Sequence, residues 1–119
     1  MQQAILYNYN FKKTIMTVQF NTDKNLTLHE EFRDKLNDLL SDELSRFSEN
    51  ITRVEVHLSD INGHKAGQND KRCMLEARVE GRPPIAVTAE EDTYELSVSA
   101  AIDKLQSSLE TIQGRMTNH

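Results

Sequence analysis

The spacing of apolar side chains changes along the chain and divides it into elements. Residues 16–20 form a short run that is typical of a β-strand. Residues 28–47 then carry apolar side chains at intervals of three and four, which predicts an amphipathic helix with one apolar stripe. In residues 53–59 the interval falls to two, and this alternation predicts a strand with one buried face.

The second half of the chain repeats these patterns. Residues 72–79 alternate again, with Cys73 on the apolar side. A glycine and two prolines in residues 81–84 indicate a turn, and residues 85–89 follow as another short strand. Residues 94–112 return to helical spacing, which predicts a second amphipathic helix.

Residues that favour helix ends border both helical segments. Thr27 and Glu30 match a capping box, in which the hydroxyl and the carboxylate satisfy free amides of the first turn. Residues 92–95 can cap the second helix, and Gly114 is where we expect that helix to end. The first helix should therefore begin directly after Thr27.

The order β-α-β-β-β-α places the chain in the α+β class. Its apolar faces are all covered if both helices pack on one face of a four-stranded sheet, which leaves the other face in water. The first two strands are joined through a helix and can run parallel, whereas turns make the later strands antiparallel. The residues expected in the core are Phe32, Leu36, Leu40, Val98, Ile102 and Leu105, packed against Val54, Val56, Leu75 and Val79.

Residues 1–15 follow neither period, although Tyr7, Tyr9 and Phe11 lie among them. We interpret them as a flexible N-terminal extension, with Met16 as the functional start; an ordered N-terminal arm is the alternative. Residues 16–119 are then expected to form one domain, because a chain of 119 residues has the size of a single core.

The composition argues against several classes of protein. No apolar run approaches the roughly 20 residues of a membrane helix, and no signal peptide is recognisable, so we expect a cytoplasmic protein without membrane association. Cys73 is the only cysteine, and its apolar position indicates a core residue and not a nucleophile. Because the four histidines are scattered and no catalytic constellation is present, we expect no enzyme, metal site, cofactor or small-molecule substrate.

Three short segments give the chain a resemblance to a known family. Residues 89–94 form an acidic segment that ends in Asp-x-Tyr, residues 102–105 read Ile-Asp-Lys-Leu, and a loop ends in residues 70–73. Together with the order of elements from Met16 to Ile112, they make the chain similar to short forms of the ribosome hibernation-promoting factors and ribosome-associated translation inhibitors. The resemblance implies rRNA binding on the small ribosomal subunit, near its decoding region, and inhibition of translation in stationary phase or stress.

The candidates for RNA binding are positive side chains on the outward phase of the strands, at the turn over residues 81–84 and in or beside the loop over residues 60–70, since arginine can contact phosphate through two hydrogen bonds. Lys104 is added because it matches the lysine of the family's Asp-Lys-Leu stretch. The alternative is that these charges solvate an exposed face and pair across strands with Glu55 and Glu76. The full set of candidates is Arg53, His57, His64, Lys65, Lys71, Arg72, Arg78, Arg82 and Lys104.

The overall charge supports a second hypothesis. The formal net charge is -5, whereas proteins that bind nucleic acid are usually basic. Family members carry repeated Lys and Arg at the end of the last helix, but residues 106–112 contain none. The chain is therefore either an rRNA-binding factor or a protein-interaction module that kept the fold and lost RNA binding. A continuous positive sheet face favours RNA, and a patchwork of charges favours a protein partner; the oligomeric state stays open.

Overall fold

The computed structural model describes residues 16–22, 28–62 and 67–117, so the predicted extension over residues 1–15 lies outside the described residues. The elements follow the predicted order β-α-β-β-β-α, with a short 3₁₀ helix, η2, after the first α-helix. Their bounds are β1 (Thr17–Thr22), α1 (Glu30–Glu43), η2 (Ser45–Phe47), β2 (Ile51–Asp60), β3 (Lys71–Val79), β4 (Ile85–Glu91) and α2 (Tyr94–Thr117).

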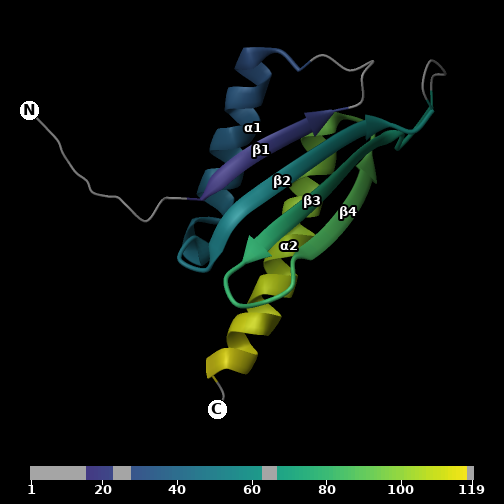
Figure 1. Cartoon of the computed structure of the whole chain (residues 1–119). Helices are drawn as coiled ribbons and strands as arrows, with labels where there is room; N and C mark the ends of the chain where they lie inside the picture. The colour runs from purple at the N-terminus through teal and green to yellow at the C-terminus, as the bar shows by residue number, and fades with distance from the viewer. Residues whose placement is uncertain (1–15, 23–27, 63–66, 118–119) are drawn as a thin grey trace, which may run out of the picture.

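The strands form one sheet in the order β1-β2-β3-β4. β1 runs parallel to β2 because α1 carries the chain back to the start of the sheet, and the other two pairs are antiparallel. Both α-helices lie behind this sheet, and its other face is open (Figure 1). The predicted fold class is thus confirmed.

The core lies between the helices and the inner face of the sheet. Leu36, Leu40 and Leu44 from the α1 region are fully buried, as are Val98 and Leu105 from α2. The predicted strand residues Val54, Val56, Leu75 and Val79 all belong to the same cluster. Phe32 differs from the prediction, because it is only partly buried at the margin of this cluster.

Both ends of α1 differ from the predicted helix. His29 has extended backbone angles of φ -68° and ψ 149°, so α1 begins at Glu30 and not directly after Thr27 as the capping box predicted. Thr27 itself lies outside the described residues. α1 ends at Glu43, and the separate turn η2 brings the buried Phe47 into the core. The predicted continuous helix from Leu28 to Phe47 is therefore two shorter pieces.

The prediction is confirmed at the start of α2 and is wrong at its end. At its start, the Thr93 hydroxyl oxygen accepts a hydrogen bond from the Leu96 amide at 3.0 Å, which confirms the predicted cap. At its other end, α2 continues through Gly114 to Thr117, so the predicted stop is wrong. Glycine permits a helix to end because it tolerates left-handed angles, but it does not force the chain to adopt them.

No helix in the described ranges is long and apolar enough to cross a membrane.

Candidate nucleic-acid interface

Alternation along β2 and β3 places the predicted arginines on the outward face of the sheet. Arg53, Glu55 and His57 share this face of β2, and their counterparts on β3 follow from the antiparallel register. Arg53 pairs with Arg78, and Glu55 pairs with Glu76. Residues of like charge therefore lie directly opposite each other, an arrangement that is unfavourable unless opposite charges are close.

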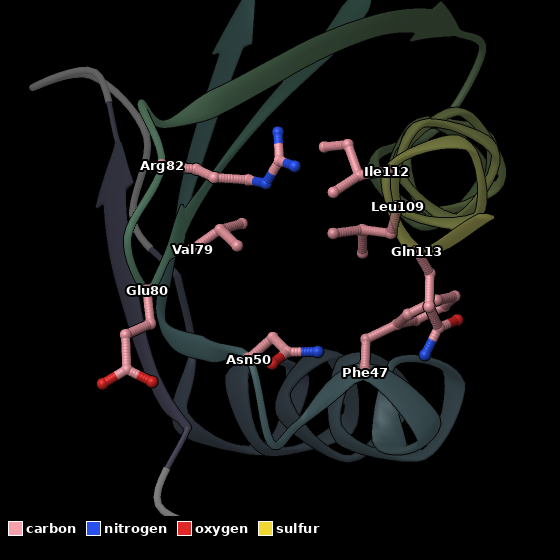
Figure 2. Close-up of a pocket in the computed structure, with 8 residues that line it drawn as sticks. All are labelled: Phe47, Asn50, Val79, Glu80, Arg82, Leu109, Ile112 and Gln113. Atoms are coloured by element: carbon pink, nitrogen blue, oxygen red, sulfur yellow. The ribbon is translucent and has the colours of Figure 1, made fainter. Parts of the chain in front are cut away.

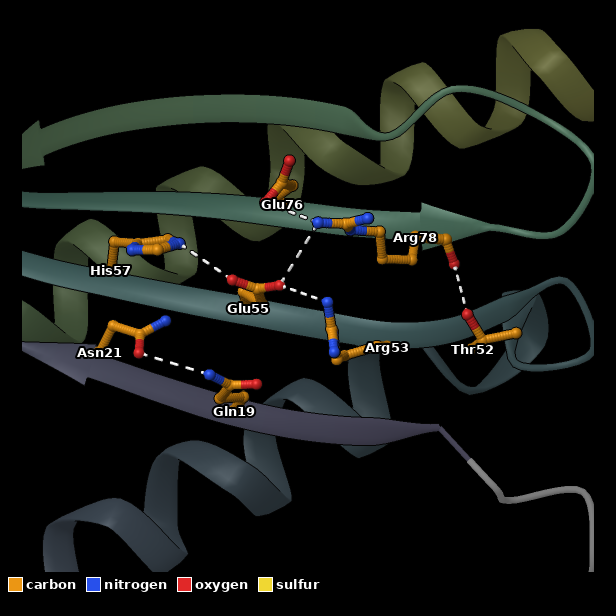
Figure 3. A network of polar contacts seen from close by, with 8 residues as sticks. All are labelled: Gln19, Asn21, Thr52, Arg53, Glu55, His57, Glu76 and Arg78. Atoms are coloured by element: carbon orange, nitrogen blue, oxygen red, sulfur yellow. Dashed lines mark hydrogen bonds and ion pairs between the residues drawn. The ribbon is translucent and has the colours of Figure 1, made fainter.

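Glu55 provides that opposite charge for both arginines. Its Oε2 atom lies 2.8 Å from an Arg53 Nη2 and 3.7 Å from the Arg78 Nη2 (Figure 3). The Glu55 side chain is only 13% exposed, whereas the two arginines are 41% and 45% exposed. Glu76 adds a weaker contact to Arg78, at 3.9 Å. The carboxylate of Glu55 thus holds both guanidinium groups against the sheet.

His57 lies on the other side of Glu55 from the arginines (Figure 3). Its Nε2 atom is 3.6 Å from Glu55 Oε1, which is too long for a hydrogen bond. This nitrogen is inaccessible to solvent and has no hydrogen-bond partner in the part of the chain that the structure describes, and the same is true of Arg53 Nε.

Arg72 pairs with Glu90, which is its direct neighbour on β4. Its Nε and Nη2 atoms donate to Glu90 Oε2 at 3.1 and 2.7 Å. Arg53, Arg72 and Arg78 are therefore matched by Glu55, Glu76 and Glu90 on the same face. The outward face is a patchwork of paired charges and not a continuous positive surface.

Lys71 is held at the base of the β2–β3 loop. Its Nζ atom lies 2.9 Å from Asp60 Oδ2 and 3.0 Å from Asp70 Oδ1, and Asp70 is buried. Hydrogen bonds to these two carboxylates raise the pKa of Lys71 above its ordinary value. Lys71 was predicted as an RNA-binding residue, but its charge is already satisfied within the fold. His64 and Lys65 lie outside the described residues.

Arg82 and Lys104 make no ion pair with any residue that the structure describes. Arg82 follows Gly81, whose φ of 76° allows the β3–β4 turn, and it borders a pocket of about 30 Å³ (Figure 2). This pocket is far below the roughly 300–1,000 Å³ that is usual for small ligands. Lys104 Nζ donates to the carbonyl oxygen of Thr88 on β4 at 2.6 Å.

A larger hollow of about 440 Å³ lies on the outward face of the sheet. Asn21, His57 and Arg72 contribute polar side chains to it, while Met74 contributes apolar surface. Alternation along the strands predicted that His57 and Arg72 lie on this face, but it did not predict the hollow, because the hollow depends on the alignment of all four strands.

The outer surface of α1 has the opposite character to the sheet. Its carboxylates make no ion pair with described residues, and all are exposed: Glu30, Glu31, Asp34, Asp38, Asp42 and Glu43. Lys35 instead pairs with Glu95, and Arg46 pairs with Glu110, so cations near α1 connect it to α2.

Comparison with known proteins identifies the family. The profile described as "Sigma 54 modulation protein / S30EA ribosomal protein" matches residues 21–117. The chain belongs to this S30EA family. The match confirms the resemblance to ribosome hibernation factors that the sequence motifs indicated.

Two solved structures share the S30EA fold with this chain. The Protein Y N-terminal domain of Thermus thermophilus has a TM-score of 0.64 at 20% identity, and the match covers 82% of this chain and 99% of that one. A ribosomal subunit interface protein from Coxiella burnetii has a TM-score of 0.62 at 18% identity, with 83% and 99% covered. No curated protein matches the sequence.

Cys73 of this S30EA chain is fully buried on the inner face of the sheet. Burial raises the pKa of its thiol to about 12, since the thiolate would lose its hydration. The thiol therefore stays protonated and is not activated as a nucleophile.

Proposed function

We propose that this chain is a cytoplasmic, ribosome-associated factor that binds rRNA of the small subunit and lowers translation in stationary phase or stress, without catalysis. Membership of the S30EA family supports association with the ribosome. The Coxiella burnetii structure, which shares the fold, is described as a ribosomal subunit interface protein.

The observation that carries the RNA-binding part is the 440 Å³ hollow on the open sheet face. RNA is commonly recognised on exposed sheets, where unstacked bases meet side chains and phosphates meet arginine or lysine. Arg72, His57 and Asn21 supply polar groups beside the hollow, and Met74 offers an apolar surface to a base. The covered inner face is filled by core side chains and offers no comparable surface.

In this proposal phosphate groups compete with carboxylates for the arginines. Arg53 and Arg78 exchange part of their contact with Glu55 for phosphate, and Arg72 exchanges its contact with Glu90. The exposed side chains of Arg82 and Lys104 need no such exchange of ion pairs. His64 and Lys65, which lie outside the described residues, stay in the proposed interface, and Lys71 contributes mainly by fixing the ends of β2 and β3 to each other.

Co-sedimentation with purified small subunits tests the proposal. Replacing Arg53, Arg72 and Arg78 by Glu should abolish association, because the hollowed face becomes strongly negative. Wild-type association should also weaken as salt rises, with a log-log slope of roughly -0.7 to -0.9 per phosphate neutralised. Because Glu55 loses its partners in this variant, circular dichroism must show that the variant is still folded. The triple change to Gln provides a milder version, for which we expect weakened association.

The matched control reverses three cations on the helix side, namely Arg33, Lys35 and Arg46. This variant has the same net charge as the sheet-face triple variant, but it leaves the hollow intact. Association should survive in the control, once circular dichroism shows that it stays folded without the ion pairs of Lys35 and Arg46 to α2. If both triple variants lose association equally, overall charge and not the sheet face determines binding, and the proposed interface is wrong.

A protein-interaction module is the second candidate, and the paired charges of the sheet face favour it. Its contact surface would be the acidic outer side of α1, which suits a basic partner. Failure of the wild-type protein to sediment with small subunits even at low salt would support this candidate over the first.

A further inference from the structure

Three potential metal ligands converge at the centre of the outward sheet face. Glu55 and His57 come from β2 and Glu76 from β3, and one ligand atom from each lies within 4.8 Å of the other two. All three residues are partly buried. Because they lie on two hydrogen-bonded strands, their backbone positions are fixed by the register of the sheet and not by a loop.

The two oxygens of Glu55 have different surroundings. Oε2 faces Arg53 and Arg78, at 2.8 and 3.7 Å, whereas Oε1 faces His57. The arginines therefore anchor the carboxylate through one oxygen and leave the other directed toward the imidazole. A carboxylate that neighbouring groups orient, here through ion pairs, is typical of metal sites, where outer groups hold the coordinating carboxylate.

The imidazole of His57 has an unsatisfied nitrogen at the same place. Its Nε2 atom is buried, has no hydrogen-bond partner among the described residues and lies 3.6 Å from Glu55 Oε1. A buried polar atom without a partner is rare in folded proteins and often indicates a bound water or ion. The gap between the imidazole nitrogen and the carboxylate oxygen is thus where a ligand is expected.

We propose that Glu55, His57 and Glu76 bind a divalent transition-metal ion, with Zn²⁺ as the best fit. One imidazole and two carboxylates suit Zn²⁺, whose ligands lie at about 2.0–2.2 Å, whereas Ca²⁺ requires six to eight oxygens. The three ligand atoms already lie within 4.8 Å of one another, so an ion placed between them would be coordinated once the side chains close to that distance from the metal. Three protein ligands leave a fourth position for water or a partner group.

The two arginines neutralise the negative charge of this site when no metal ion is bound. Arg53 and Arg78 offset the charges of Glu55 and Glu76, so the carboxylates are stable beside each other without an ion. An added cation must share Glu55 with these two positive groups, and this repulsion should weaken binding relative to a structural zinc site. Metal binding at this site does not require the ribosome, so it can be tested independently of the proposed function.

Isothermal titration of the untagged full chain with ZnCl₂, without ribosomes, tests the site. We expect one equivalent of Zn²⁺ to bind wild-type protein. His57→Ala and Glu76→Gln should each weaken binding by more than about tenfold, which is the lower range for loss of even an outer-shell partner. Thermal unfolding of each variant without metal shows whether the sheet is intact.

Other histidines provide the matched controls. His29→Ala removes an imidazole at the start of α1, and a His64→Ala, His119→Ala double variant removes the two that lie outside the described residues. Both controls should retain wild-type affinity. The proposal is overturned if wild-type protein binds no Zn²⁺, if His57→Ala binds as tightly as wild type, or if the loss follows His64 and His119 instead.

Discussion

The outward face of the sheet and the outer side of α1 both carry many charges, but they arrange them differently. On the sheet, Arg53, Arg72 and Arg78 are matched with nearby glutamates. On α1, six carboxylates stand against two cations, and the carboxylates make no ion pair with described residues. A large part of the net charge of -5 therefore belongs to the helix layer.

This difference shows why the total charge is a weak guide to the partner. An acidic total does not make the sheet face acidic, and the presence of arginines does not make it basic. If the sheet face meets rRNA, then the acidic side of α1 is on the opposite side of the molecule, where it is kept away from phosphates (Figure 1). Substitutions on the two surfaces can therefore be compared directly.

The largest expected effect is on the free energy of unfolding, and it distinguishes the buried side of α1 from its exposed side. Leu36 is fully buried, whereas Asp38, two residues later, is exposed. Leu36→Ala should lower the free energy of unfolding by about 2–5 kcal/mol, the range for truncation of a buried leucine. Asp38→Ala should not lower it, because the change removes like-charge repulsion on the exposed side of the helix. Urea unfolding measures both, and equal losses would show that the face of α1 is misassigned.

A smaller effect is expected from the carboxylate that the sheet arginines share. Glu55→Gln removes the charge that holds Arg53 and Arg78, and it should cost about 1 kcal/mol of stability, because both arginines are substantially exposed and can be hydrated. The same change frees two guanidinium groups, so binding to small-subunit rRNA should tighten and depend more steeply on salt.

Asp38→Asn is the control for this change, since it removes one carboxylate from the α1 surface. It raises the net charge by the same amount but leaves the sheet arginines paired. Filter binding at several salt concentrations should show tighter RNA binding for Glu55→Gln than for Asp38→Asn. Equal tightening in both variants would mean that only overall charge matters.

The smallest expected effect is a gain in stability on α1. Asp34, Asp38 and Asp42 follow each other at intervals of four, so their like charges repel along one side of the helix. Asp38→Lys replaces two repulsive pairs by two attractive ones and should raise the free energy of unfolding by about 0.5 kcal/mol. This gain should shrink in high salt, and a loss of stability would contradict the view that these carboxylates are unpaired.

The sequence predicted most of the fold because apolar periodicity directly reports which side of each element is covered. Val54, Val56 and Leu75 were assigned to the inner face from alternation alone, and they are buried there. Helix ends were less predictable. Residues such as Thr27 and Gly114 permit a helix to begin or end, but the surrounding structure determines where it does so.

The candidate site was only partly predictable, for a related reason. Alternation predicts that Arg53 and Arg78 point outward, and their pairing with Glu55 and Glu76 is the alternative interpretation of the same pattern. The remaining contacts depend on the register between neighbouring strands, which a single sequence does not fix. Arg72 meets Glu90, and Lys71 meets Asp60, only because β3 is aligned with both neighbouring strands.

The contact of Lys104 with Thr88 has a consequence for self-association. β4 is an edge strand, and an edge exposes backbone groups that can pair with another chain and start aggregation. Lys104 occupies one backbone acceptor of this edge and places a positive charge beside it. A variant that lacks this lysine loses both forms of protection, so precipitation of such a variant would reflect an unguarded edge as well as any change in partner binding.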